Sequence, residues 1–180
     1  MAILDDVTGV LAGPLVKKIN FHLGKLTVSA AKLGEVAAAM RNGTITLEVK
    51  STGGRLSAGY SPAPIRKMVL SSDKIVDALG RSGIVHESVH AVVDLSGQKA
   101  IGARLDEAVA YIAESIYLSA AGLGLSRIAA EPAAKKIYTE AYAVVDKRHL
   151  LKKQGVRLSE ADCEALGKAI AAHTAAYPGL

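Results

Sequence analysis

The sequence has a single cysteine, a single phenylalanine and no tryptophan among its 180 residues. One cysteine, Cys163, excludes an intrachain disulfide. It lies in a helical pattern without an activating neighbour, so we expect an inert thiol. Because aromatic residues make up only 4% of the chain, the core must consist of Ala, Val, Leu and Ile, a composition that favours closely packed helices.

Long apolar runs and a secretion signal are also lacking. No apolar run reaches about 18 residues, the length that a membrane-spanning helix needs. The amino terminus carries Asp5 and Asp6 where a signal peptide has Lys or Arg. We therefore expect a soluble, cytoplasmic protein without a membrane partner, while export by a route that leaves no cleavable signal stays open.

The charge of the chain is only mildly basic, with a formal net charge of +5. Its basic pairs are spread along the sequence and no block of five or six like charges occurs, so we interpret them as solvated helix faces and expect no nucleic-acid partner. Hydrophobic residues make up 50% of the chain, enough for one core. We expect a single domain over residues 1–180, of unknown oligomeric state.

The pattern of apolar residues predicts an α+β fold, with a small antiparallel sheet near the N-terminal half packed on a mainly helical bundle. A helix and the sheet would occupy approximately residues 1–80. Residues 81–180 would be helical and would carry the metal site. Expected strands lie at 44–50, within 55–62 and at 65–72; Ser72 or Asp73 would cap a short helix that ends near residue 80. Expected longer helices lie at 26–41, 84–95, 104–121, 126–149 and 159–173, and from residue 84 onward the signal is helical to the end.

The most informative segment is "GIVHESVHAVVDL", residues 83–95. His86 and His90 are four residues apart, so both imidazoles leave the same helix face one turn apart. Glu87 points about 100° around the helix, where it can reach a water on the same ion. Two histidines that hold a metal and a carboxylate that takes a proton from its water make up a known hydrolytic arrangement.

Chance is a poor explanation of this motif. The expected number of His-Glu-x-x-His matches for this composition is roughly 0.006. The alternative is a buried neutral histidine pair that is satisfied by hydrogen bonds, although desolvating two imidazoles and a carboxylate without a metal costs free energy.

On "HESVH" within "IVHESVHAVV", the chain resembles the zincin superfamily of zinc metallopeptidases. The later segment "RLDEAVAYIAESIY" is similar to the glutamate-bearing helix of the gluzincin branch, and the likeness covers about residues 65–118. The resemblance implies that His86 and His90 bind Zn²⁺, that Glu107 is the third ligand and that Glu87 is the general base. It also implies that a sheet edge, for which 65–72 is the candidate, binds the substrate as an added strand.

Helix length also favours Glu107 as the third ligand. If the first helix ends near residue 94 and the second begins near residue 101 and runs back, about six residues at 1.5 Å each return the chain to the level of the histidines. Glu107, Tyr111 and Glu114 form one polar stripe on an otherwise apolar helix, which either binds a cation or is simply the solvent face. Glu114 and Asp106 remain rival ligands.

The sequence also departs from the gluzincin pattern. Tyr111 stands where many gluzincins have an aspartate that orients a ligand histidine, and Asp94 is a candidate for that role. The sequence does not single out a residue that would stabilise the oxyanion of the transition state in peptide cleavage. By residue type alone, the candidates are Tyr60, Tyr111, His149 and His173.

The sequence therefore predicts a zinc-dependent metallopeptidase that acts on a peptide or protein substrate. Two alternatives stay open: a metal-binding domain without peptidase activity, and a helical protein-interaction domain without a metal.

Overall fold

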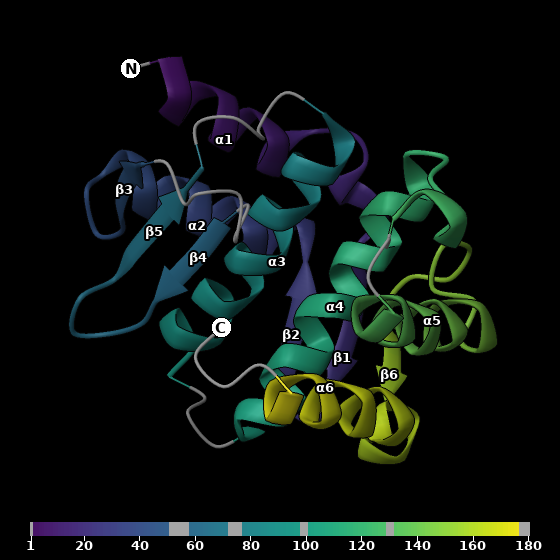
Figure 1. The fold of residues 1–180 in the computed structure, drawn as a ribbon. Helices are drawn as coiled ribbons and strands as arrows, with labels where there is room; N and C mark the ends of the chain where they lie inside the picture. The colour runs from purple at the N-terminus through teal and green to yellow at the C-terminus, as the bar shows by residue number, and fades with distance from the viewer. Residues whose placement is uncertain (1, 51–57, 72–76, 98–100, 129–131, 177–180) are drawn as a thin grey trace.

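The computed structural model describes residues 2–50, 58–71, 77–97, 101–128 and 132–176 (Figure 1). In these residues the fold is α+β, with six α-helices and two three-stranded sheets. The helices are α1 (Ala2–Ala12), α2 (Ala30–Arg41), α3 (Ala78–Leu95), α4 (Ala103–Ala120), α5 (Pro132–Lys147) and α6 (Glu164–Ala176). The strands are β1 (Asn20–Leu23), β2 (Leu26–Ser29), β3 (Thr46–Val49), β4 (Ala58–Ser61), β5 (Lys67–Leu70) and β6 (Val156–Leu158).

The sheet that was predicted from the sequence contains β3, β5 and β4, in that order. All three predicted strands are present, but the sheet is mixed rather than antiparallel, because β3 pairs with β5 in parallel. The prediction that residues 65–72 form a sheet edge is wrong, since β5 is the central strand. The strand that lies against α3 is β4 (Figure 1).

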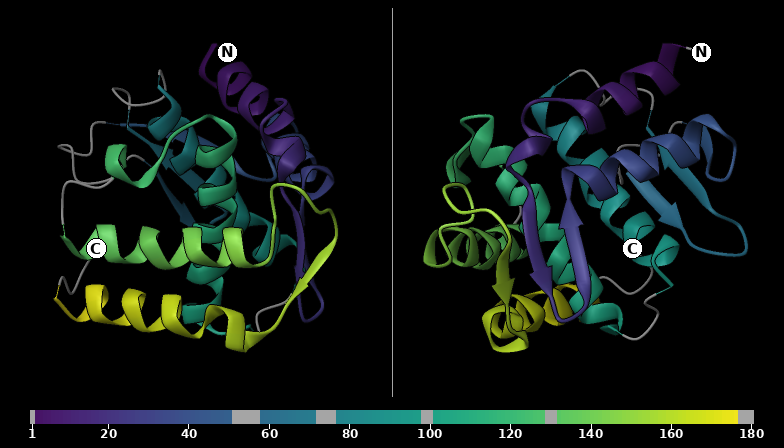
Figure 2. Two further views of the ribbon diagram at one scale, coloured as in Figure 1. Left: turned by 90° about the vertical axis from the view of Figure 1, so that its right-hand side faces the viewer. Right: turned by 180° about the vertical axis from the view of Figure 1, so that it is seen from behind.

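A second sheet, in the order β2-β1-β6, was not predicted. Figure 2 shows it from behind, with the β1–β2 hairpin beside β6. Residues 26–29 were expected to begin a helix, but they form β2, and the helix starts only after Ser29, whose side chain accepts a hydrogen bond from the Lys32 N–H. The expectation that the chain is helical from residue 84 onward is wrong at β6, which pairs in parallel with β1.

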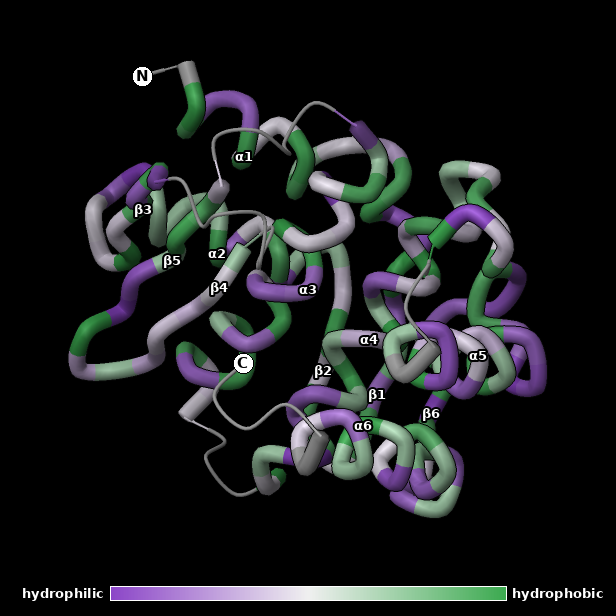
Figure 3. The backbone as a smooth tube through the Cα atoms, viewed as in Figure 1, coloured by the Kyte–Doolittle hydropathy of each residue, from purple (hydrophilic) through white to green (hydrophobic). Residues whose placement is uncertain are grey.

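The antiparallel pair α3 and α4 forms the centre of the fold. Contacts between them run in opposite directions along the sequence, since Ser82 and His86 meet Glu114 while His90 meets Asp106. Both helices are buried over most of their length, and one continuous apolar core joins them to the other helices and to both sheets. In Figure 3, by contrast, hydrophilic and hydrophobic segments alternate along the outer helix α5.

Several helix boundaries differ from the predicted ones. α3 begins six residues earlier than expected, and its N-cap is Asp77, whose side chain accepts a hydrogen bond from the Gly80 N–H. Residues 72–76, where Ser72 or Asp73 was expected to act as a cap, lie outside the described residues. Ser126 lies in a 3₁₀ turn, Leu125–Arg127, rather than at the start of α5. Ser159 caps a second 3₁₀ turn, Glu160–Cys163, from which α6 continues.

No helix within the described ranges combines the length and the apolar character that crossing a bilayer requires.

Asp94 fastens the turn between β4 and β5 to the last turn of α3. Its carboxylate accepts hydrogen bonds from Tyr60 Oη at 2.9 Å, from Arg66 Nε at 2.8 Å and from the Ala63 N–H at 3.3 Å. The Asp94 side chain is only 5% exposed. Burial alone would raise its pKa, but the three donors outweigh burial and hold the pKa of Asp94 below its ordinary value. Asp94 therefore positions β4 and does not orient a histidine, which corrects the role considered from the sequence.

We expect Asp94→Asn to lower the free energy of unfolding by about 1–3 kcal/mol near pH 7, because charge-assisted hydrogen bonds are lost. Since the folded-state pKa is lowered, this contribution exists above the unfolded-state pKa of about 3.9 and is lost as the pH falls through the folded-state value. Urea unfolding at pH 7 and pH 3 should show the difference between variant and parent shrinking in acid. Asp6→Asn, at an exposed position on α1, is the control and should change little. A difference that is equal at both pH values would contradict the role given to the Asp94 charge.

Candidate functional site

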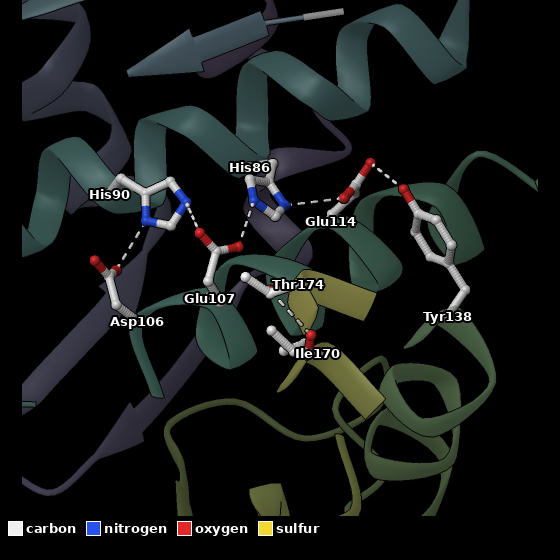
Figure 4. Close-up of polar contacts among 8 residues, drawn as sticks. All are labelled: His86, His90, Asp106, Glu107, Glu114, Tyr138, Ile170 and Thr174. Atoms are coloured by element: carbon white, nitrogen blue, oxygen red, sulfur yellow. Dashed lines mark hydrogen bonds and ion pairs between the residues drawn. The ribbon is translucent and has the colours of Figure 1, made fainter. Parts of the chain in front are cut away.

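His86 and His90 extend from one face of α3 toward α4, one helical turn apart (Figure 4). Their ring centroids are 5.0 Å apart and the rings are steeply inclined to each other. The His86 ring is buried and the side chain of His90 is 14% exposed. The spacing of "HESVH" on a helix therefore places both rings beside α4, as the sequence predicted.

Glu107 on α4 lies across from both histidines. Its Oε2 is 3.5 Å from His86 Nε2, and its Oε1 is 3.6 Å from His90 Nε2. One ligand atom from each of the three residues lies within 4.8 Å of the others. Two atoms that bind one tetrahedral ion at about 2.0–2.1 Å are about 3.4 Å apart, so these three side chains could hold a metal ion between them.

The other nitrogen of each ring faces a second carboxylate. His90 Nδ1 lies 2.9 Å from Asp106 Oδ1, and His86 Nδ1 lies 3.1 Å from Glu114 Oε2 (Figure 4). A carboxylate only accepts hydrogen bonds, so the proton of each neutral ring resides on Nδ1 and the lone pair of Nε2 faces Glu107. Asp106 and Glu114, the rivals for the third ligand, thus lie on the side of the rings away from Glu107 and orient them.

Glu114 is the centre of a buried hydrogen-bond network. Its Oε1 accepts hydrogen bonds from Ser82 Oγ at 2.7 Å and from Tyr138 Oη at 2.9 Å, while its Oε2 faces His86. The network joins α3, α4 and α5 at one carboxylate. The sequence analysis missed both hydroxyl partners; Ser82, one turn before His86, was the available signal, whereas nothing in the sequence singled out Tyr138.

The polar stripe on α4 is not a solvent face. Glu107 and Glu114 both meet histidines of α3, and the Tyr111 ring packs edge-to-face on the His86 ring with a centroid distance of 4.6 Å. The Tyr111 ring also meets the Tyr138 ring at 5.6 Å. The stripe therefore contacts the histidines of α3 over its whole length, beside the candidate metal group that His86, His90 and Glu107 form.

The carboxylates around His86 favour its charged form in the metal-free chain. Burial lowers the pKa of this imidazole, but the hydrogen bonds that the ring donates to Glu107 and Glu114 outweigh burial and hold the pKa of His86 well above its ordinary value.

Glu87 faces the cleft beside the two histidines. Desolvation raises the pKa of Glu87 above the ordinary value for a glutamate, against the opposing effect of His86 and His90 and with a contribution from Glu107. A hydrogen bond from the backbone of Tyr60 in β4 also reaches this carboxylate. Glu87 thus lies between the two histidines and β4, with a raised pKa that makes it a stronger base than an ordinary glutamate.

The site opens into a cleft of about 1150 Å³. Its walls come from β4, from α3 and the first half of α4, and from α6, whose Ile170 and Thr174 appear on the same side of α4 as Glu107 in Figure 4. Of the residues considered as oxyanion donors, Tyr60, Tyr111 and His173 line the cleft, whereas His149 is not among the lining residues. The Tyr60 hydroxyl already donates to Asp94.

No protein-family model matches the sequence, and the searches of curated proteins and of solved structures found no match either.

We expect Glu114→Gln to destabilise the fold by about 1–3 kcal/mol, because a neutral amide cannot accept all three of the hydrogen bonds that meet at this buried carboxylate. The free energy of unfolding from chemical denaturation measures the effect. Glu164→Gln is the matched control; Glu164 pairs with Lys168 on the surface of α6, where such a pair contributes little. Equal stabilities for the two variants would show that Glu114 is not the centre of the network.

Proposed function

We propose that this chain is a zinc-dependent peptidase of the zincin type, similar to the gluzincin branch. The observation that carries the proposal is that both histidine Nε2 atoms lie 3.5–3.6 Å from the Glu107 carboxylate and that one ligand atom from each of the three residues lies within 4.8 Å of the others, close enough for one ion.

The donor set suits zinc better than other common ions. Two imidazole nitrogens and one carboxylate oxygen are the protein ligands of many catalytic zinc sites, which keep a fourth position open. Here the three donors border a cleft, so a fourth position is accessible to water and substrate. Asp106 and Glu114 supply the carboxylate partners that metal-bound histidines usually have.

Bound zinc would polarise the substrate carbonyl and lower the pKa of a coordinated water to about 7. Glu87 then acts as the general base: it accepts a proton from the water whose oxygen attacks the carbonyl carbon. When the C–N bond breaks, Glu87 passes this proton to the leaving amine. Its raised pKa and its place in the cleft support both steps.

β4 is the segment suited to hold the substrate. It is the last strand in the order β3-β5-β4, so its outer edge pairs with no strand among the described residues. Ala58, Gly59 and Tyr60 line the cleft along this edge. An extended peptide could add to β4 through backbone hydrogen bonds, a mode that favours peptides and unfolded protein segments as substrates.

Tyr111 is the best-placed donor to the carbonyl oxygen of the substrate. It lines the cleft one helical turn after Glu107 and packs against His86. Burial and the nearby carboxylates raise the pKa of Tyr111, so its phenol keeps its proton over the working pH range and can donate it in a hydrogen bond.

The chain should bind one zinc ion and release protons as it does so. Because the pKa of His86 is raised in the metal-free chain, we expect this ring to carry a proton at neutral pH that must leave when zinc binds. Zinc affinity should therefore fall with decreasing pH, starting above about pH 6.5, the ordinary histidine value. Titration calorimetry in buffers of different ionisation enthalpy counts the protons released.

Zinc at a thousandfold excess over its Kd should also raise the melting temperature by about 10 °C. His90→Ala should lose most of this shift, whereas His149→Ala, outside the cleft, should keep it. No zinc uptake by the purified parent, or zinc uptake without proton release, would contradict the site.

Glu87→Gln should reduce peptide hydrolysis at least about 100-fold while zinc content stays near that of the parent, because the amide cannot accept the proton. Turnover of a quenched fluorescent peptide library, together with elemental analysis for zinc, measures both. Glu35→Gln, at an exposed position on α2, is the control and should act like the parent. A Glu87→Gln variant as active as the parent would exclude the mechanism. Zinc binding without hydrolysis by the parent would instead favour a metal-binding domain without peptidase activity.

A further inference from the structure

Arg104 stands at the start of α4, three residues before Glu107, and its exposed side chain lines the cleft. It is the one lysine or arginine among the described residues that line this cleft. Residues three apart on a helix are neighbours on its surface, so the positive charge of Arg104 lies close to the candidate metal group.

Three of the four carboxylates that line the cleft have partners other than Arg104, and the fourth, Glu87, accepts a hydrogen bond from the backbone of Tyr60. Asp94 is bound by Arg66, Asp106 faces His90 and Glu107 faces both histidines. No ion pair joins Arg104 to a carboxylate in the part of the chain that the structure describes. Within the described residues, the cleft thus contains a guanidinium whose hydrogen-bond donors are open to a ligand.

The aliphatic part of Arg104 is held in place by α6. A Cβ atom added at Gly167 would lie 2.9 Å from Cδ and 3.2 Å from Cγ of Arg104. The side chain therefore crosses α6 at the one position without a side chain, a turn before Ile170 and Ala171, which line the cleft. The stem of Arg104 therefore packs against α6, although the side chain as a whole is exposed.

We propose that Arg104 determines specificity by binding a carboxylate of the peptide substrate, an inference that rests on the proposed peptidase function. A guanidinium binds a carboxylate through two parallel hydrogen bonds. Arg104 lies about 4.5 Å along α4 from Glu107. With the reach of its side chain, the bound carboxylate belongs one to about three residues from the bond that is cut.

Two sources can supply this carboxylate: the carboxyl terminus of the substrate, or the side chain of an Asp or Glu near the cleavage point. The first makes the chain an enzyme that trims one to about three residues from carboxyl ends, and the second makes it an endopeptidase with an acidic preference. Both share the same contact with Arg104.

Peptide binding tests the contact without requiring turnover. The probes are two pairs of fluorescein-labelled heptapeptide pools of mixed sequence. In the first pair, one pool ends in a free carboxyl group and the other in an amide. In the second pair all peptides end in an amide, and one pool carries Glu and the other Gln at each position in turn. Fluorescence anisotropy measures their affinity for the zinc-treated full chain carrying Glu87→Gln. The same measurements are made after adding Arg104→Gln, Arg104→Lys or, as matched control, Arg127→Gln at an exposed position outside the cleft.

The inference predicts that one pair of pools shows an approximately 10-fold preference for the carboxylate form. Arg104→Gln should abolish this preference, Arg104→Lys should retain part of it, and Arg127→Gln should leave it unchanged. Gly167→Ala should weaken it with the fold intact, because the added methyl group displaces the arginine stem. The pair that responds identifies the source of the carboxylate.

The inference would be overturned if the Glu87→Gln chain showed no preference for the carboxylate pools, or if the preference survived the addition of Arg104→Gln. A preference that depends on Arg104 in a chain that hydrolyses no peptide would uphold the contact and reject the peptidase, so the two failures are distinguishable.

Discussion

The candidate site depends on the pairing of each histidine Nδ1 with a carboxylate of α4. Without Asp106 and Glu114, neither ring would have a preferred tautomer or rotation, and no interaction would direct both Nε2 atoms toward Glu107. With them, both Nε2 atoms face Glu107. The site is thus organised in advance by hydrogen bonds within the protein, which lowers the entropy lost when a ligand is captured.

Such a site also constrains the fold that carries it. Burying two imidazoles and several carboxylates between two otherwise apolar helices is unfavourable unless each group has a partner. The structure meets this condition with short contacts: Glu114 accepts from Ser82 and Tyr138, and Asp94 accepts from Tyr60, Arg66 and a backbone N–H. The first group fixes α5 against the α3–α4 pair and the second fixes β4 against α3. The polar residues near the cleft therefore also hold its walls in place.

The local parts of the structure were predictable from the sequence, and the long-range parts were not. The helix around His86 and His90 and the level of Glu107 follow from helical spacing and the rise per residue. β6 escaped prediction because β1, the strand that it pairs with among the described residues, is about 135 residues away, and a three-residue strand has no periodicity of its own. Residues 26–29 were assigned to a helix because apolar spacing continues across Ser29, whereas the turn at Gly24, with φ +57°, pairs them with β1 instead. Likewise, Asp94 and β5 were given the wrong roles because strand order is a tertiary property.

The roles of the three acidic residues on α4 follow from the antiparallel packing. Because α4 runs opposite to α3, the partner of the earlier histidine must come later on α4, and the partner of the later histidine earlier. Glu114 therefore meets His86, Asp106 meets His90, and Glu107 meets both. The two orienting carboxylates are eight residues apart, although the histidines are only four apart, because each Nδ1 points outward from the pair while each Nε2 points inward. This geometry leaves the position four residues after Glu107 without an orienting task, and Tyr111 occupies it, with its ring on His86 and a place in the cleft wall. The carboxylate that orients His86 thus lies about one turn after Tyr111 on α4, and the Tyr111 phenol takes a place in the wall of the cleft.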